Sequence, residues 1–318
     1  MQVESAYGVS AKRIMAKLQP LVSVIIPSYK MGAYIGEALQ SVGAQSYRRW
    51  EVVVVDDCGP DDGTYDVIKA FRTSFPDYRV EYVRHPTNRG VSAARNTAIA
   101  AAEGEFLAFL DPDDSWFPDH LSNCMGAFSR DAAVAVVTGP VEIFGNNDAG
   151  RVWPNWQAQG WRRDYFPESL SIQNFIQICA TVARRSVVAE VGGFDVTPAL
   201  QHIEDYDLWI RLADRGYRFV FLDEKTARYR RHDAAATANP EVGRLLNHEL
   251  CARHIGFFIR MHGKFARDMY EEVQSLNLEM TRLKSAIRNP LLWLVERRKL
   301  RLTTKLSSPP SRTSGRSE

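Results

Sequence analysis

Continuous apolar runs alternate with segments of helical spacing along the first two thirds of the chain. The runs are rich in β-branched residues, as is typical of strands buried on both faces of a sheet. The strands that they predict, with some polar residues included, occupy residues 21–29, 50–57, 80–85, 105–114 and 134–144. Between them, apolar residues recur every three or four positions, which predicts helices. These helices occupy residues 32–44, 64–75, 92–104 and 119–128. Strand–helix repetition with short connections predicts an α/β domain with a mostly parallel sheet flanked by helices.

The pattern divides the chain into four parts. Residues 1–20 form an N-terminal extension, 21–238 the α/β domain, 239–305 an α-helical extension and 306–318 a disordered Ser/Pro/Arg-rich tail. From Arg288 onward the chain carries eight basic residues and two acidic ones. Two interpretations of the short basic helix after Pro290 stay open. It docks on the domain, with cations favoured by its dipole, or it anchors the chain peripherally on an anionic membrane.

An irregular stretch between Gly145 and Leu170 interrupts the alternation. It contains Trp153, Trp156 and Trp161. Aromatic side chains in a long loop form either a local core or a stacking surface for a sugar or its aglycone, and both interpretations remain.

Composition excludes several classes of protein. The 318 residues carry 40 Lys and Arg against 38 Asp and Glu, a balance that argues against nucleic acid as the main partner. No run of 18 apolar residues occurs, and the first twenty residues lack the apolar centre of a secretory signal. Four widely spaced cysteines without a CxxC pair argue against a structural zinc or a disulfide framework. We expect a cytoplasmic enzyme.

Polar residues gather where the predicted strands end. Ligands of an open parallel sheet bind outside the carboxyl ends of its strands, so this edge is the expected working face. The residues are Pro27, Ser28, Tyr29, Asp56, Asp57, His85, Asn88, Asp111, Asp113 and Asp114. No GxGxxG, GxxxxGK[ST] or GxSxG motif follows a strand, so the usual dinucleotide, P-loop and hydrolase sites are absent from the sequence.

Two acidic clusters are candidates for chemistry. Asp111, Asp113 and Asp114 offer oxygen ligands suited to Mg²⁺ or Mn²⁺ bridging a diphosphate, although an Asp before SWF is also a good helix N-cap. Glu204 and Asp205 begin a predicted helix, where the helix dipole stabilises acidic side chains. A carboxylate at this position could also act as a general base. Asp207 points to another helix face and is predicted to be structural.

Read in order, five segments resemble glycosyltransferase family 2. They are VSVIIPSYK, VVVVDDCGPDDGT, NRGVSAARN, FLAFLDPDDSW and GGFD followed by EDYDLWIRLADRGYRF, and they extend from about Leu21 to His232. The resemblance implies a GT-A fold, a nucleoside-diphosphate sugar donor, Mn²⁺ or Mg²⁺, and transfer with inversion. It also suggests polysaccharide biosynthesis for the cell envelope.

The resemblance implies donor-binding roles for several positions. Pro27, Ser28 and Tyr29 match the segment that lines the nucleoside pocket, and Asp57 or its neighbour Asp56 matches the acid that binds the base, usually uracil. The remaining donor residues on this resemblance are Asn88, Arg95, Asp111 and Pro112. Lys30 and the segment CGPDDGT depart from the common family pattern and leave the donor's details open.

The same resemblance implies the reacting groups. Asp111 and Asp113 match the metal-binding DxD motif, with Asp113 as the expected direct ligand. Glu204 and Asp205 match the ED pair, with Asp205 as the catalytic base. His232 matches a histidine that reaches the metal or diphosphate in some relatives, and a structural role is the alternative.

The implied reaction is transfer of a sugar from a UDP-like donor to a glycan or lipid-linked acceptor. A nucleotidyltransferase that makes nucleoside-diphosphate sugars is one alternative, although SYKMGAY is a poor substitute for its glycine-rich loop. A catalytically silent donor-binding subunit is the other alternative. Such a subunit would be expected to have lost the base or a metal-binding acid, but Asp111, Asp113 and Asp205 are all present. Residues 131–201 carry no family motif beyond GGFD, so the acceptor and its linkage cannot be identified from the sequence.

Overall fold

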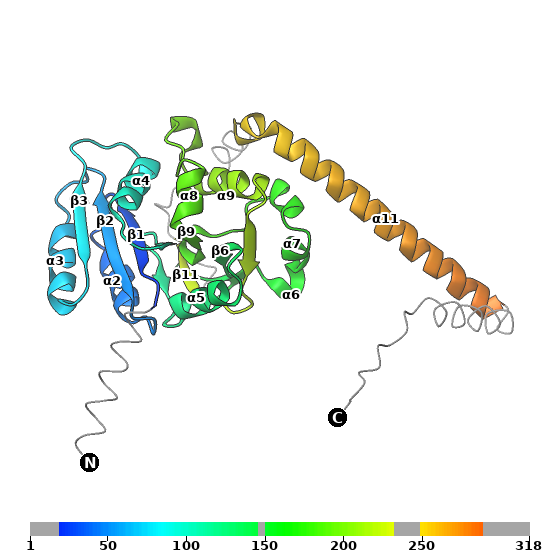
Figure 1. The fold of residues 1–318 in the computed structure, drawn as a ribbon, viewed down its shortest axis with the longest axis horizontal. Coiled ribbons are helices and arrows are strands. Elements are labelled where there is room, and N and C mark those ends of the chain that lie inside the picture. Colours follow the sequence, from blue (N-terminus) through cyan, green and yellow to red (C-terminus); the bar gives the residue numbers. More distant parts are fainter. Residues whose placement is uncertain (1–18, 146–149, 232–248, 289–318) are drawn as a thin grey trace, which may run out of the picture. The chain divides into compact units, whose positions relative to one another are not determined.

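The computed structural model describes residues 19–145, 150–231 and 249–288 (Figure 1). The chain divides into two compact units, the first ending at His262 and the second beginning at Gly263. Four predictions fall outside the described residues: the N-terminal extension up to residue 18, the basic helix after Pro290, the C-terminal tail, and the role of His232.

A mixed sheet forms the centre of the first unit, in the order β10-β6-β9-β4-β1-β2-β3. Strand β1 pairs in parallel with β2 on one side and β4 on the other, whereas β9 is antiparallel to β4 and β6. The predicted α/β fold with a mostly parallel sheet is therefore confirmed. The strands are β1 (Val22–Ser28), β2 (Trp50–Asp56), β3 (Val80–Arg84), β4 (Phe106–Phe109), β6 (Val134–Thr138), β9 (Val182–Arg184) and β10 (Arg218–Phe221).

Helices cover both faces because adjacent residues of each central strand point to opposite sides. Ile26 belongs to one buried cluster and its neighbour Ile25 to the other. The first cluster includes residues of α2 (Ile35–Gly43), α3 (Thr64–Ser74) and α5 (His120–Arg130). The second includes residues of α4 (Val91–Ala101), α8 (Arg185–Glu190) and α9 (Glu204–Asp214). Burial on both sides explains the uninterrupted apolar runs in the sequence.

A smaller sheet has the order β5-β11-β7-β8. Its strands are β5 (Ser115–Trp116), β7 (Val141–Gly145), β8 (Val152–Trp153) and β11 (Ala227–Arg231). The single strand predicted over 134–144 is wrong, because β6 and β7 belong to different sheets. Gly139 and Pro140 separate them, and a proline has no N–H to continue a ladder.

The irregular stretch contains the short helices α6 (Trp156–Gln159) and α7 (Trp161–Asp164) and ends in η1 (Glu168–Ser171). Two further short helices follow it, η2 (Ile178–Ala180) and η3 (Pro198–Leu200). Trp156 packs edge-on against Phe175 and Phe221, and its indole N–H donates to the Leu222 carbonyl over 2.8 Å. Trp153 and Trp161 flank the guanidinium of buried Arg162. The local-core interpretation therefore describes Trp156, while Trp153 also lines the pocket described below.

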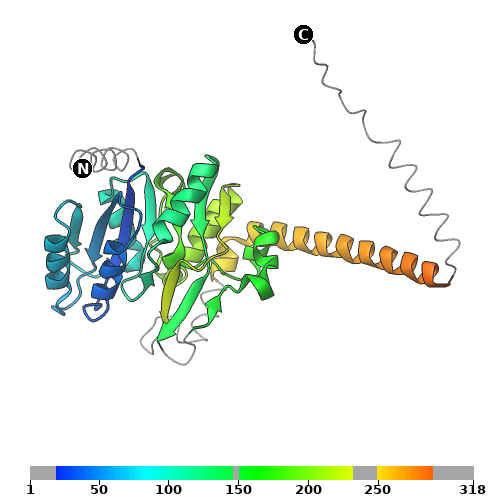
Figure 2. The same ribbon diagram turned by 90° about the horizontal axis from the view of Figure 1, so that it is seen from below.

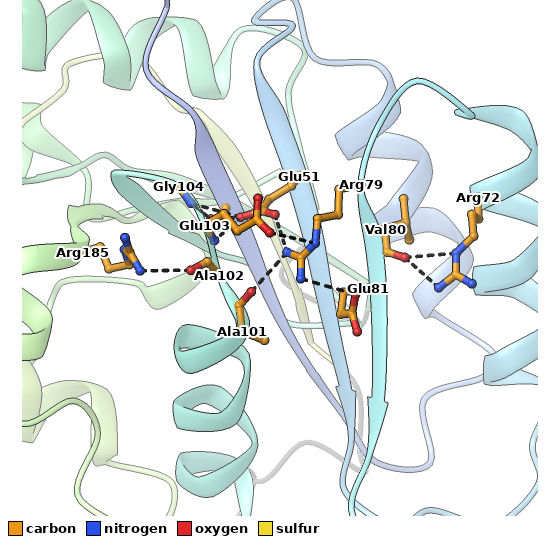
Figure 3. A network of polar contacts seen from close by, with 11 residues as sticks. Glu51, Arg72, Arg79, Val80, Glu81, Ala101, Ala102, Glu103, Gly104 and Arg185 are labelled. Atoms are coloured by element: carbon orange, nitrogen blue, oxygen red, sulfur yellow. Dashed lines mark hydrogen bonds and ion pairs between the residues drawn. The ribbon is translucent and has the colours of Figure 1, made fainter.

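Figure 3 shows a polar network around buried Glu51 at the amino-terminal edge of the main sheet. Glu51 is 1% exposed and accepts hydrogen bonds from Ser23, the Glu103 and Gly104 backbone N–H groups, and Arg79. Burial alone would raise the pKa of Glu51, but these donors outweigh burial and hold that pKa below its usual range. The network joins β1, β2 and the end of α4, far from the edge where the strands carry their candidate site residues.

Helix α11 (Ile255–Arg288) is one uninterrupted helix of 34 residues (Figure 2). Its first turns belong to the first unit, where Phe257 and nearby Leu250 are buried in the second cluster. Within the described ranges, none of the helices combines the length and apolar character that crossing a bilayer requires.

Candidate active site

The candidate site lies where the strand order of the main sheet reverses. From β1 the chain continues through β2 to β3 on one side, and β4 lies on the other side of β1. In doubly wound sheets, such a switch point opens a crevice at the carboxyl ends of the strands. Ser28 ends β1, and Asp111 follows β4 by two residues. The end of β1, which carries Pro27 and Ser28, and Asp111 are therefore neighbours. We call residues 111–114 the DPDD turn.

One buried arginine connects the two acidic clusters. Arg95 lies on α4 and is 3% exposed. Its Nη2 lies 2.7 Å from Asp111 Oδ1, and its Nη1 lies 2.5 Å from Glu204 Oε1. Burial would lower the pKa of the guanidinium, but the two carboxylates outweigh burial and raise it. The structure thus brings the DPDD turn and the start of α9 to the same place, although they are far apart in the sequence.

Asp205 has the environment of a poised base. Its carboxylate accepts a hydrogen bond from Asn174 Nδ2 over 3.2 Å and one from the Tyr206 backbone N–H over 2.7 Å. Burial, assisted by the neighbouring charge of Glu204, raises the pKa of Asp205 to about 7. A carboxyl with this pKa accepts protons near neutral pH far better than an exposed aspartate.

Asp205 also faces a pocket of about 640 Å³. Besides Asp205, the polar lining includes Arg151, Asn174, Gln177 and Arg231. Trp153, Tyr206 and Tyr229 supply aromatic surface to the same pocket. Immediately before α9, His202 has a φ of 73°, a left-handed conformation that non-glycine residues rarely adopt. Such backbone strain concentrates at functional sites, and here it sets the start of the helix that carries Asp205.

The three acids of the DPDD turn have different surroundings. Asp111 is paired with Arg95, and its side chain is 25% exposed. Asp114 is buried and accepts the Arg230 backbone N–H over 2.8 Å, and burial raises its pKa well above the usual range. Arg230 Nε also donates to the Asp113 carbonyl over 2.8 Å. Strand β11 therefore fixes the turn, leaving Asp111 and Asp113 as the partly exposed acids.

The two candidate base-binding acids already have protein partners. Asp56 accepts hydrogen bonds from Gly59 N–H, Tyr82 Oη and Arg84 Nη1 at 2.5 to 2.9 Å. That Asp57 or Asp56 binds the nucleobase stays a prediction.

Asp57 shapes the loop after β3. Its carboxylate lies 2.6 Å from His85 Nδ1 and accepts the backbone N–H groups of Arg89 and Gly90. Asn88 Nδ2 donates to the Asp57 carbonyl over 3.2 Å. Asp57 therefore holds the segment that precedes α4, the helix carrying Arg95.

The end of β1 presents a partly exposed surface beside these acids. Pro27 and Ser28 are buried, whereas Tyr29 is 41% exposed and carries the Lys30 ammonium over its ring at 5.0 Å. Lys30 has a φ of 60°. The strand thus ends in a sharp turn that leaves an aromatic face accessible.

Asp207 has the structural role that the sequence predicted. It is fully buried. Its Oδ2 lies 2.8 Å from Nε and 2.7 Å from Nη2 of Arg211 within α9, and its Oδ1 lies 2.7 Å from His254 Nε2. These partners outweigh the effect of burial and lower the pKa of Asp207. It ties α9 to the segment that leads into α11.

Asn174 is a site residue that the sequence did not reveal. It lies in an irregular segment between η1 and η2. Only the folded chain brings it next to the candidate base, Asp205, to which it donates a hydrogen bond. The available signal was weak: three amides, Gln173, Asn174 and Gln177, close together in an otherwise apolar stretch.

Few protein side chains are available to bind a divalent cation at this site. In the described part of the chain, no three His, Cys, Asp or Glu side chains are grouped to hold a metal ion. Magnesium-type sites at phosphates commonly use one or two carboxylates, with substrate oxygens and water completing the shell. Asp111 and Asp113 fit that description.

Comparison with known proteins gives a consistent picture. The family model described as glycosyl transferase family 2 matches residues 23–192. The putative teichuronic acid biosynthesis glycosyltransferase TuaG of Bacillus subtilis is 31% identical over 71% of this chain and 84% of that protein. The Escherichia coli protein named UDP-Glc:alpha-D-GlcNAc-diphosphoundecaprenol beta-1,3-glucosyltransferase WfgD is 27% identical over 69% of this chain and 80% of that protein.

Solved structures share the fold. S. aureus TarS 1–349 in complex with UDP-GlcNAc matches 72% of this chain and 66% of that one, with a TM-score of 0.54 and 24% identity. This chain spans only 39% of a longer TarS chain. The mannosyltransferase PcManGT of Pyrobaculum calidifontis, in complex with GDP-Man and Mn²⁺, matches 82% of this chain and 81% of that one, with a TM-score of 0.55 and 19% identity.

Proposed function

The chain belongs to glycosyltransferase family 2 and is a glycosyltransferase with the GT-A fold, and we propose that it transfers a sugar with inversion from a UDP-sugar to an acceptor hydroxyl. The observation that carries this proposal is the Arg95 bridge. It joins the turn suited to a metal–diphosphate to the helix that carries a poised carboxylate. A single displacement at an anomeric carbon needs these two functions at one site, on opposite sides of the reacting sugar.

Asp205 acts as the general base. With a pKa of about 7 it takes the proton of the acceptor hydroxyl as the oxygen attacks the anomeric carbon. The bond from that carbon to the diphosphate breaks as the new glycosidic bond forms, so one protein carboxylate suffices and the configuration inverts. Asn174 holds the base by its 3.2 Å hydrogen bond, and Glu204 stays bound to Arg95.

Asp111 and Asp113 would hold the divalent cation. Bound there, a Mn²⁺ or Mg²⁺ ion supplies charge neutralisation for the leaving diphosphate. Arg95 keeps the Asp111 carboxylate oriented, and β11 fixes the turn through the backbone of Asp113 and the side chain of Asp114. The mannosyltransferase neighbour was solved with Mn²⁺, which supports this part of the proposal.

Donor choice rests on the relatives and on the end of β1. The Escherichia coli relative is named for a UDP-Glc donor, and the TarS neighbour was solved with UDP-GlcNAc. Pro27, Ser28 and Tyr29 would line the nucleoside pocket, with Tyr29 offering an exposed ring for stacking on a base. Asp56 or Asp57 and Asn88 would border the base on the β2–β3 side.

The pocket beside Asp205 would receive the acceptor. Its volume of about 640 Å³ suits a sugar with part of its aglycone, and its amides and aromatic rings are typical of carbohydrate binding. Arg151 and Arg231 would favour an acceptor that carries phosphate. We therefore propose a lipid-linked sugar acceptor, met at the cytoplasmic membrane face during polysaccharide biosynthesis.

A product assay tests the proposal. The full chain is incubated with Mn²⁺, a UDP-sugar panel and a GlcNAc-diphosphate lipid, and UDP release and the anomeric configuration of the product are measured. We expect UDP release with a β-linked product from an α-linked donor, and loss of both in Asp205→Asn. Retention of configuration, or pyrophosphate release from UTP and a sugar phosphate, would contradict the proposal.

A further inference from the structure

The part of α11 that follows Gly263 carries a heptad pattern in its sequence. Apolar residues recur at alternating intervals of three and four, which is the repeat of a coiled coil. In the usual lettering, the a positions are Ala266, Val273, Met280 and Ile287, and the d positions are Met269, Leu276 and Leu283. We call these seven positions the seam. They cover three consecutive heptads without a polar interruption.

Seam residues whose environment is described are exposed to solvent. Leu276 is 55% exposed and Met280 is 53% exposed. One heptad before Ala266, Ile259 also occupies an a position and is 66% exposed, whereas the d position between them is His262, whose Nε2 lies 2.9 Å from the Ser171 carbonyl oxygen. Long helices in water obtain most of their stability from packing an apolar face, so a helix of this length with such a stripe calls for a partner.

We propose that the seam packs against the same seam of a second copy of this chain, forming a parallel two-stranded coiled coil. A self-complementary stripe on one helix is what a two-fold homodimer uses, and such dimers are the commonest oligomers. This inference concerns assembly and does not depend on the proposed reaction.

Charges beside the seam favour the parallel arrangement. The g positions include Glu272 and Glu279, and the e positions include Asn277 and Lys284. In a parallel pair, g of one helix lies opposite the following e of the other, which opposes Glu279 to Lys284 twice. In an antiparallel pair, g positions face g positions, and glutamates would oppose glutamates.

The polar face argues against a lipid surface as the occupant. Helices that lie on anionic membranes carry mainly Lys and Arg on their polar side. Here the outer positions mix Arg267 with Asp268 and Glu271. A mixed polar face is typical of the solvent side of a coiled coil.

Sedimentation equilibrium of the full chain tests the proposal with a matched pair of variants. Leu276 and Leu278 are both exposed, at 55% and 61%, but Leu276 is in the seam and Leu278 is at an outer f position. We expect the wild type and Leu278→Glu to have twice the 36.0 kDa mass of one chain at micromolar concentration. We expect Leu276→Glu to be monomeric there, with a dimer dissociation constant raised at least about 100-fold.

Cysteine substitutions at the same two positions test orientation. In a parallel pair a d position lies next to its own copy, so Leu276→Cys should form an oxidised dimer with an added oxidant and Leu278→Cys should not. The native cysteines are the same in both variants. A monomeric wild type, equal effects at 276 and 278, or binding of the wild-type monomer to anionic vesicles would each overturn the proposal.

Discussion

The Arg95 guanidinium lies 2.5 Å from the Glu204 carboxylate, and both groups are buried at the carboxyl edge of the main sheet. Glu204 immediately precedes Asp205, and the other terminal nitrogen of Arg95 holds Asp111. The contact therefore fixes the distance between the candidate base and the turn suited to a metal–diphosphate. Arg95 is a positioning residue whose loss should disturb both halves of the site.

We expect Arg95→Lys to reduce kcat by at least about 100-fold and to lower stability by about 3 kcal/mol, because a lysine cannot hold two carboxylates and leaves a buried charge unpaired. Urea unfolding and steady-state kinetics measure the two effects. Arg79→Lys is the matched control, since Arg79 binds Glu51 at the opposite edge of the sheet (Figure 3). It should lose stability while retaining kcat, and equal kcat losses in both variants would contradict a role specific to Arg95.

Activity should depend on pH through Asp205. The base must be ionised, so kcat/KM should rise tenfold per pH unit below about 7 and level off above it, following the raised pKa of this carboxyl. Asp205→Asn should lose about 10²- to 10⁴-fold in turnover and lose this ascending limb. Initial rates between pH 5 and 9 with saturating donor measure the profile. An unchanged limb in Asp205→Asn would assign the titration to another group.

Stability should show the opposite dependence. The folded-state pKa of Asp205 lies above its unfolded value, so the folded protein binds the proton more tightly and this group's stabilising contribution fades as pH rises from about 4 to about 7. Asparagine does not ionise, so Asp205→Asn avoids this decrease in stability at high pH. The variant should therefore melt at a higher temperature than the wild type at pH 8, with a smaller difference at pH 5. Thermal unfolding at both values measures it, and a larger gain at pH 5 would reverse the assigned sign.

Much of the fold could be predicted because the central strands are buried on both faces. Residues 52–55 are four consecutive valines, and burial on both sides leaves little freedom in interpreting such a run. The break at Gly139 and Pro140 was missed because both flanking segments are apolar, and only tertiary structure assigns them to different sheets. The antiparallel β9 has three residues, too few to show a period.

The site was predictable to the extent that it sits at strand and helix ends. Asp111 and Asp205 were singled out by position and by the family resemblance, and the structure shows the Arg95 connection between their segments. Asn174 was not predicted, because its role comes from a contact between segments and not from any local pattern. The exposure of Leu276 and Met280 on α11 was equally hidden, because the sequence alone does not give the accessibility of a side chain.

Asp113→Ala should weaken donor binding only when metal is present. Asp113 is one of the two acids proposed to hold a cation, and the donor diphosphate would share that cation. Calorimetry of UDP binding with Mn²⁺ should show at least about a tenfold loss, and without Mn²⁺ little change. Asp61→Ala, at an exposed acid of the loop after β2, is the control and should bind as the wild type does in both conditions. Equal wild-type affinity with and without Mn²⁺ would remove the metal site.

The final prediction concerns Asn174 and separates positioning of the base from packing of the pocket. Asn174 Nδ2 donates to Asp205 Oδ2, a hydrogen bond that favours the ionised carboxylate and so lowers its pKa against the effect of burial. In Asn174→Ala that donor is lost, and the ascending limb of kcat/KM should move to higher pH by about half a unit to one unit. Its neighbour Gln173 lines the same pocket but accepts from Arg162 over 3.1 Å. Gln173→Ala should therefore leave the limb in place, even if its KM for the acceptor rises. A limb that moves equally in both variants would mean that Asn174 acts through the shape of the pocket and not through its hydrogen bond to Asp205.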